Sequence, residues 1–337
     1  MKNEKIIVSL EPILEYSLCE HTHSSRFSEG LACVLKNNKY GYIDETGRLA
    51  IPFDFDNALP FFEGLACVTI KEKSGFIDKT GKIIIPLKYE LAYNFSNGTA
   101  LVHENEQSYF IDKSGNVISS FNYSVELPSE GMALIEKNEK FGFASEKGDI
   151  VIPYIYDDAL SFSEGLAAVG KGNKWGYIDK NGKTIIPFIY DDVGYFSKGF
   201  SEGLVSVQQN GKWGCIDKNG DIVIPFIQYE PIGKFSEGLA AVWIDAECTY
   251  IDKNSRLVIP HEYSYADDFS EGYAYTIKIK GKVITHKYID KNGESVFSFD
   301  NSFNDSPDDY NYKATPFSES LALFQKQGKI GILKKLG

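Results

Sequence analysis

The sequence predicts an all-β protein made of about nine tandem repeats, and three observations support this prediction. The phrase Phe-Ser-Glu-Gly returns roughly every 34 residues. Tyr, Phe and Trp make up 14% of the 337 residues, and aromatic side chains suit the pleated surface of a sheet. Turn residues recur at constant offsets and separate three short apolar segments in each copy. The glycine of the phrase stands at Gly30, Gly64, Gly98, Gly131, Gly165, Gly203, Gly238 and Gly272, and Ser320 replaces it in a ninth copy.

The first predicted strand of each repeat follows the Glu-Gly pair, as in residues 166–169. Its second residue is Ala in every copy except the sixth, which has Val205. A small side chain kept so regularly predicts the close approach of a neighbouring backbone or ring.

The second predicted strand carries a Trp-Gly pair, which is complete in Trp175-Gly176 and in Trp213-Gly214. Glycine weakens a strand, so its recurrence inside one predicts a bulge or a ring packed over bare backbone. The Trp position holds Ser74 in another copy, which indicates that it is a packing position.

A turn of the form Asp-x-x-Gly follows, as in Asp179 to Gly182 and Asp217 to Gly220. Aspartate can bond to its own backbone at the start of such a turn, and glycine supplies the positive φ at its end. The third predicted strand then ends on Ile-Pro, as at Pro187, because proline donates no hydrogen bond and belongs at a strand end or sheet edge.

This order of a Phe-Ser-Glu-Gly-Leu-Ala strand, a Trp-Gly pair and an Ile-Asp-Lys-Asn-Gly-Lys hairpin resembles the bacterial WG repeat family, also called KWG repeats. The resemblance covers about residues 27–337, and the copies that contain Trp175 and Trp213 match it most fully. It implies a β-repeat that serves as a binding or scaffolding module, and it supplies no catalytic residue.

A repeat of this size cannot bury its own apolar face, so neighbouring repeats must stack. Three strands per repeat and about nine repeats favour an open solenoid or superhelix, since propeller blades usually have four strands and number four to eight. The alternative is a closed β-propeller-like ring, because residues 328–337 lack a third strand and residues 2–10 resemble the missing piece.

We therefore expect residues 1–26 to form an N-terminal cap or completing strand and residues 27–337 to form the repeat array, with an insert at about 297–315. The units begin near residues 27, 61, 95, 128, 162, 200, 235, 269 and 317.

The net charge of −12 disfavours binding to nucleic acid or to an anionic membrane, because both depend on Lys and Arg. The five cysteines include no Cys-x-x-Cys pair, so we expect free thiols, a reducing compartment and a cytoplasmic location. Cys19, His21 and His23 lack the spacing of a zinc site, and no nucleophile elbow or phosphate loop is present. We expect no metal, no cofactor and no enzymatic activity.

Aromatic and acidic residues on the connectors between repeats, and in the insert, are the candidate partner contacts, since tyrosine is enriched at binding hot spots. The alternative is that the tyrosines fill the seams between repeats and that acidic pairs such as Asp157-Asp158 cap the connectors. The candidates are Tyr156, Tyr190, Tyr229, Tyr263, Tyr265, Asp308, Asp309, Tyr310 and Tyr312.

These features predict a non-catalytic scaffold that binds a protein or peptide through an acidic, aromatic-rich surface. Two alternatives remain: a carbohydrate or cell-surface ligand binder that uses Trp175 or Trp213, and the regulatory subunit of a multi-protein system. Accessible tryptophans would favour the carbohydrate binder.

Overall fold

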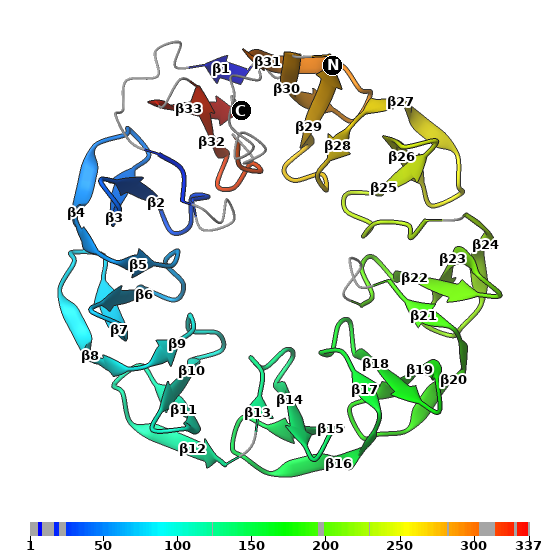
Figure 1. Ribbon diagram of the computed structural model, residues 1–337, viewed down its shortest axis with the longest axis horizontal. Coiled ribbons are helices and arrows are strands. Elements are labelled where there is room, and N and C mark those ends of the chain that lie inside the picture. The colour runs from blue at the N-terminus through cyan, green and yellow to red at the C-terminus, as the bar shows by residue number, and fades with distance from the viewer. Residues whose placement is uncertain are drawn as a thin grey trace. The chain divides into compact units, whose positions relative to one another are not determined.

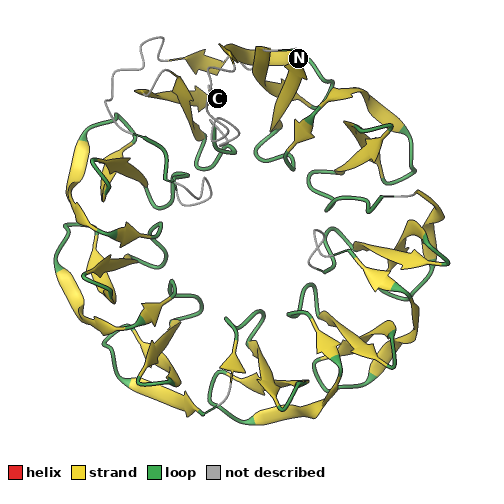
Figure 2. Cartoon of the chain, viewed as in Figure 1, coloured by secondary structure: helices red, strands yellow, loops and turns green. Residues whose placement is uncertain are grey.

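The computed structural model describes residues 6–8, 17–19, 25–122, 124–194, 199–228, 230–281, 283–302, 314–326 and 329–335. The regular elements of this described part are all strands, joined by turns and loops (Figure 2). They fall into two compact units. Unit 1 comprises Met1–Gly98, Lys113–Gly115 and Tyr263–Gly337, and unit 2 comprises Thr99–Asp112 and Asn116–Glu262. The predicted all-β class and tandem repeats are confirmed.

One repeat of unit 2 shows how the sequence makes each sheet. β18 (Leu166–Lys171) and β19 (Lys174–Asp179) pair as a hairpin, in which Lys171 lies opposite Lys174. The two loop residues between them, Gly172 and Asn173, both have positive φ, as a two-residue hairpin turn requires. The Asp179 turn then leads to β20 (Thr184–Tyr190), which pairs antiparallel with β19.

A short additional strand precedes the first strand of most repeats. β17 (Asp158–Ala159) pairs with β18, so this sheet has four strands in the order β17-β18-β19-β20. The sequence predicts only three strands per repeat, because a strand of two residues is too short to show an alternation of apolar and polar residues. Four strands per sheet are usual for propeller blades.

The strands of the described part form nine sheets, and Figure 1 labels them. In unit 1 these are β1 (Ile6–Val8), β33 (Lys329–Lys335) and β32 (Leu321–Lys326); β2 (Leu31–Lys36), β3 (Lys39–Asp44) and β4 (Leu49–Phe55); β5 (Asn57–Ala58), β6 (Leu65–Ile70), β7 (Lys73–Asp78) and β8 (Ile83–Tyr89); and β28 (Tyr265–Ala266), β29 (Tyr273–Lys280), β30 (Val283–Asp290) and β31 (Ser295–Ser302), with the short β9 (Leu91–Ala92) in addition. In unit 2, besides β17–β20, these are β10 (Thr99–Glu104), β11 (Gln107–Asp112) and β12 (Val117–Phe121); β13 (Ser124–Val125), β14 (Met132–Lys137), β15 (Lys140–Ser145) and β16 (Ile150–Tyr156); β21 (Asp192–Val193), β22 (Leu204–Gln209), β23 (Lys212–Asp217) and β24 (Ile222–Gln228); and β25 (Leu239–Ile244), β26 (Glu247–Asp252) and β27 (Leu257–Tyr263).

The first and last strands of the array meet within unit 1. β1 pairs antiparallel with β33, and Ile7 lies opposite Lys334. An open solenoid would leave its first and last repeats unpaired, so the prediction of an open solenoid is wrong. The sheet topology is that of a β-propeller, which we considered as the alternative. Pairing β1 with β33 also covers an edge of β33 that an open array would leave exposed.

Aromatic rings fill the seams between successive sheets. Tyr177 packs edge-on against Phe200 of the next repeat, with ring centroids 5.1 Å apart. Phe143 packs on Phe162 in the same way, at 4.8 Å. Ala167 is fully buried in the apolar cluster that contains these two phenylalanines, so the small residue predicted from the repeat does lie against neighbouring rings.

The glycine of the Trp-Gly pair marks a bulge. Between β19 and β20, Ile178 lies opposite Thr184 but Tyr177 lies opposite Ile186, so Ile185 is one residue in excess. A second register shift lies at Gly176 itself: Trp175 pairs with Tyr190 and Tyr177 with Ile186, so residues 187–189 stand opposite Gly176 alone. A Cβ atom on Gly176 would lie only 2.7 Å from the Ile186 carbonyl oxygen. Glycine is therefore needed for close backbone approach, as the sequence predicted.

Candidate functional site: an apolar row on the outer strands

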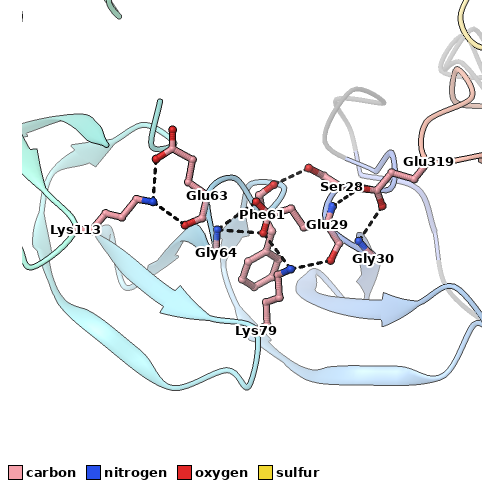
Figure 3. Close-up of polar contacts among 9 residues, drawn as sticks. All are labelled: Ser28, Glu29, Gly30, Phe61, Glu63, Gly64, Lys79, Lys113 and Glu319. Carbon is pink, nitrogen blue, oxygen red and sulfur yellow. Dashed lines mark hydrogen bonds and ion pairs between the residues drawn. The ribbon is translucent and has the colours of Figure 1, made fainter. Parts of the chain in front are cut away.

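A recurring set of hydrogen bonds and ion pairs joins Glu-Gly turns to the following repeat. Figure 3 shows part of this set for the turns of Glu29 and Glu63. Glu29 has a φ of 55° and Gly30 a φ of 83°, so the two form the centre of a tight turn. This conformation is unusual for glutamate and suits asparagine or glycine better. The reason for glutamate is its reach into the following repeat.

The Glu29 carboxylate accepts a hydrogen bond from the backbone N–H of Gly64 at 3.0 Å and an ion pair from Lys79 at 3.1 Å. Lys79 also donates to the Glu29 carbonyl oxygen at 3.0 Å. The same set of bonds joins Glu63 to Gly98 and to Lys113, and Figure 3 shows the contacts between Glu63 and Lys113. In unit 2 it recurs for Glu130 with Gly165 and Lys180, for Glu164 with Gly203 and Lys218, and for Glu202 with Gly238 and Lys253.

Serine adds a second bond at these turns, except at the Glu63 turn, where Phe62 takes the place of serine. The Ser28 hydroxyl donates to the Phe61 carbonyl oxygen at 2.6 Å, and Ser129 donates to the Phe162 carbonyl oxygen in unit 2 at the same distance. Glu319, from the last repeat, accepts hydrogen bonds from the N–H groups of Glu29 and Gly30 at 2.6 and 2.8 Å (Figure 3). The Ser-Glu-Gly phrase thus joins repeats to one another.

The acidic pairs on the connectors have structural partners. Asp157 accepts hydrogen bonds from the Lys140 side chain and, at 2.7 Å, from the Gly172 N–H. Lys140 lowers the pKa of the Asp157 carboxyl. Asp158 accepts the N–H of Ala159 at 2.8 Å. These contacts match the capping role that we weighed for the pairs in the sequence.

Three of the predicted partner contacts are buried. The side chains of Tyr156, Tyr190 and Tyr263 are only 2–4% exposed, so they offer little surface to a partner. Tyr156 stacks on Phe188 of the next repeat, with ring centroids 6.4 Å apart. They fill the seams, which was the alternative reading, and the expectation that they contact a partner is corrected accordingly.

The remaining candidates divide into two groups. Tyr265 is half-buried, and its hydroxyl donates to the Asp267 carboxylate; burial nevertheless raises the pKa of Asp267 to about 6. Tyr229, Asp308, Asp309, Tyr310 and Tyr312 lie outside the described residues, as does most of the predicted insert.

The residues assigned to the repeat framework have the predicted roles. Trp213 is 5% exposed and Trp175 packs against the apolar cluster between its own and the next sheet. The Asp179 carboxylate accepts the N–H groups of Asn181 and Lys183, both at 2.9 Å, and Gly182 has a φ of 79°. Gly176 and Gly214 lie against the carbonyl groups of Ile186 and Ile224. Asp217 accepts the N–H groups of Asn219 and Asp221, and Gly220 has a φ of 88°.

The largest set of exposed apolar side chains in unit 2 lies on the terminal strands β16, β20 and β24 (Figure 1). Each side chain is 36–59% exposed. We call this set the outer apolar row: Ile150, Val151, Ile155, Ile185, Ile189, Ile222, Val223 and Ile227.

Sequence reasoning missed the outer apolar row because Ile-Val-Ile-Pro reads as a buried strand. The bulge turns the second apolar residue outward, so Val151, Ile185 and Val223 face solvent while Ile152, Ile186 and Ile224 enter the core. The sequence did contain a signal for exposed apolar residues: three adjacent apolar residues on a strand opposite a Trp-Gly strand. One face of a bulged strand cannot bury all three, so some of them must be exposed.

The corresponding strands of unit 1 carry a weaker version of the row. β4 and β8 expose Leu49, Ile83 and Ile84, but a charged and exposed residue, Asp54 or Lys88, stands where unit 2 has Ile155, Ile189 and Ile227. In unit 2, β12 and β27 also have polar residues there, Ser120 and Glu262, so the complete set occurs on β16, β20 and β24.

The described ranges contain neither a candidate metal site nor a candidate membrane-spanning helix. No three His, Cys, Asp or Glu side chains lie close enough together there to hold a metal ion. Cys19 is buried, and His21 and His23 lie outside the described residues. In the same part of the chain there is no helix of the length and apolar character needed to cross a bilayer.

A comparison with protein families identifies the repeat. The family model described as WG containing repeat matches residues 24–40, 40–73, 75–106, 110–141, 141–175, 175–213, 213–245 and 249–282. No curated protein matches the chain. Among solved structures, Kluyveromyces lactis Hsv2 is similar at 10% identity and a TM-score of 0.42, over 82% of this chain and 95% of that one. PorZ of Porphyromonas gingivalis is similar at 10% identity and a TM-score of 0.35, over 91% and 51%. The Dos1 propeller is similar at 14% identity and a TM-score of 0.38, over 78% and 76%.

The family segments run from one Trp position to the next, for example from Trp175 to Trp213, and together they span most of the chain. The resemblance inferred from the repeated phrase is thereby confirmed, and the chain belongs to the WG containing repeat family.

Proposed function

We propose that this protein is a non-catalytic scaffold that binds a protein partner through the outer apolar row of unit 2. The observation that carries the proposal is the exposure of eight aliphatic side chains on three consecutive terminal strands. Large exposed apolar patches are rare on a protein without a partner and mark interaction sites.

The partner contacts side chains and does not add a strand. Each outer strand contains an exposed proline, at Pro153, Pro187 and Pro225, and proline cannot donate a hydrogen bond to an added strand. The aliphatic side chains around each proline supply the contact, and their burial provides the affinity.

The charge of the chain narrows the class of partner. The net charge is −12, and exposed Asp149 and Asp221 stand directly before β16 and β24. A partner surface with aliphatic residues flanked by Lys or Arg complements this arrangement. We place the complex in the cytoplasm, since the five cysteines are free and buried.

The carbohydrate alternative receives less support. It depends on the faces of Trp175 or Trp213, whereas Trp213 is 5% exposed and Trp175 packs within the seam. Trp243 is 39% exposed, but it lies on β25, outside the Trp-Gly position of the repeat.

Site-specific photo-crosslinking in the native cell tests the proposal. A photoreactive residue at Ile155, Ile189 or Ile227 should capture the same protein, and one at Ile83 in unit 1 should not. The captured protein, once purified, should bind directly. Replacing Ile155, Ile189 and Ile227 together with Ser should weaken binding by about 100-fold, because each side chain loses roughly 1 kcal/mol of burial.

Three matched substitutions at Leu49, Ile83 and Ile84 in unit 1 serve as the control and should leave the affinity unchanged. Equal binding by both triple variants would refute the assignment of the site to unit 2.

A further inference from the structure

Residues 17–19 lie between the first and the last repeat, all within unit 1. Ser17 exchanges two backbone hydrogen bonds with Leu35 of β2, at 2.8 and 2.9 Å. The neighbouring Leu18 N–H donates to the Gln325 side chain of β32 at 3.0 Å. This short segment thus contacts both ends of the repeat array.

The next residue, Cys19, lies against Cys33. The two Sγ atoms are 3.4 Å apart, and the residues are 3% and 0% exposed. The Ser17–Leu35 pair is an isolated bridge, and the Cys19 N–H donates to the Ser25 hydroxyl at 2.8 Å. The contact between Cys19 and Cys33 is therefore made by the two side chains, since the Cys19 thiol also lies 3.4 Å from the Cys33 carbonyl oxygen.

We propose that Cys19 and Cys33 are a redox-active pair that a low-molecular-weight disulfide, such as oxidised glutathione, converts to an intramolecular disulfide. The two sulfur atoms are already 3.4 Å apart, so a small movement of the two side chains brings them within bonding distance. Among the described cysteines, no other two thiols are in contact. Cys67 and Cys248 donate to backbone carbonyl oxygens instead.

The reaction proceeds by two exchanges. The Cys19 thiolate attacks one sulfur of the small disulfide, forms a mixed disulfide and releases one thiolate. Cys33 then gives its proton to that thiolate and attacks the Cys19 sulfur, which releases the second small thiol. One small disulfide is reduced to two thiols, and two protein thiols are oxidised to one disulfide.

The surroundings favour Cys19 as the first nucleophile. The hydrogen bond between the two thiols lowers the pKa of Cys19, whereas burial raises the pKa of Cys33 well above its usual range. A lowered pKa increases the fraction of reactive thiolate. Because residues 17–19 also contact Gln325, oxidation fastens the segment that joins the first and last repeats.

Cys67 provides a matched control. It occupies the position of Cys33 in the next repeat and is equally buried, at 3%. Its thiol donates to the Ala92 carbonyl oxygen at 3.3 Å and faces no second thiol within the described residues. Burial raises its pKa to about 12, so we expect no reaction there.

The test uses the purified full chain, incubated with oxidised glutathione, then denatured and alkylated. We expect peptide mapping to find a Cys19–Cys33 linkage, while Cys67, Cys215 and Cys248 are alkylated. The Cys67→Ala variant should behave like the wild type. Oxidation should raise the unfolding midpoint of both by about 5 °C, reversed by a reductant, because the disulfide restricts the unfolded chain.

Cys33→Ala and Cys19→Ala should each abolish the linkage and the shift in midpoint, and having both variants covers the case that one fails to fold. Alkylation of all five cysteines after oxidation, or a linkage that excludes either Cys19 or Cys33, would overturn the proposal.

Discussion

Glu29 reaches into the following repeat, where its carboxylate accepts the backbone N–H of Gly64 at 3.0 Å, although the two residues are 35 positions apart in the sequence. The glutamate adopts a positive φ that costs its own turn some stability. Each such glutamate therefore lowers the stability of its own turn and links two neighbouring sheets. The contribution of this link to the free energy of unfolding can be measured.

Replacing Glu63 with Ala should lower the free energy of unfolding by about 1 kcal/mol, because the Gly98 N–H and Lys113 lose their acceptor. The pairwise coupling with Lys113→Ala should be about 0.5 kcal/mol, since both side chains are about one-third or more exposed. Urea unfolding of the two single variants and the double variant gives both values. Glu63→Asn is the informative control: it suits the turn but is too short for the link, and stability clearly above that of the wild type would argue against the link.

Acid should weaken these links. Burial tends to raise the pKa of Glu63 and Glu164, but the lysine and backbone donors outweigh it, so both pKa values fall below the usual range. A carboxyl with a lowered folded pKa contributes stability above its unfolded pKa, about 4.3, and loses this contribution as the pH falls through the folded pKa.

We therefore expect the urea midpoint to fall between about pH 5 and pH 3, and the double variant Glu63→Gln, Glu164→Gln to show a smaller fall. Parallel curves for the wild type and this variant would show that other carboxyls govern acid unfolding.

Gly176→Ala should destabilise the chain by about 2–3 kcal/mol, because the new Cβ would lie 2.7 Å from the Ile186 carbonyl oxygen. Gly170→Ala on the adjacent strand is the matched control and should cost less, since its Cβ would lie 3.3 Å from the Asp158 Cβ, a milder contact than 2.7 Å. Chemical denaturation compares them, and similar losses would mean that the bulge does not require glycine.

Deleting residues 1–8 should expose one edge of β33, which pairs with β1 in the intact chain. We expect a lower unfolding midpoint and association that grows with protein concentration, because an unpaired edge strand recruits other strands. Light scattering after gel filtration measures the association. A shortened chain that stays monomeric with an unchanged midpoint would contradict the structural role of β1.

Much of each sheet could be predicted because its signals are local. The Asp179 turn, the Gly172-Asn173 hairpin and the three longer strands each depend on residues close in sequence. The two-residue strand β17 could not be predicted, since its pairing with β18 depends on the connector folding back.

The candidate site was harder to predict because exposure depends on the bulge. Ile185 and Ile186 are adjacent and chemically identical, yet one is 36% exposed and the other is fully buried. Tyr190 was misjudged for the opposite reason, since its partner Phe226 lies in the next repeat. The sequence contains one sign of the links between repeats. In the third copy Asn97 replaces the linking glutamate, and in the fourth copy Glu146 replaces the lysine with which it would pair.

The pairing of β1 with β33 also determines when the molecule can be completed. During translation, β1 leaves the ribosome before any of the repeats, while β33 follows about 300 residues later. At ~5–20 residues per second, this delay lasts roughly 15–60 s. The intervening sheets can form in order during that time, but the sheet that contains both strands can form only after β33 has emerged.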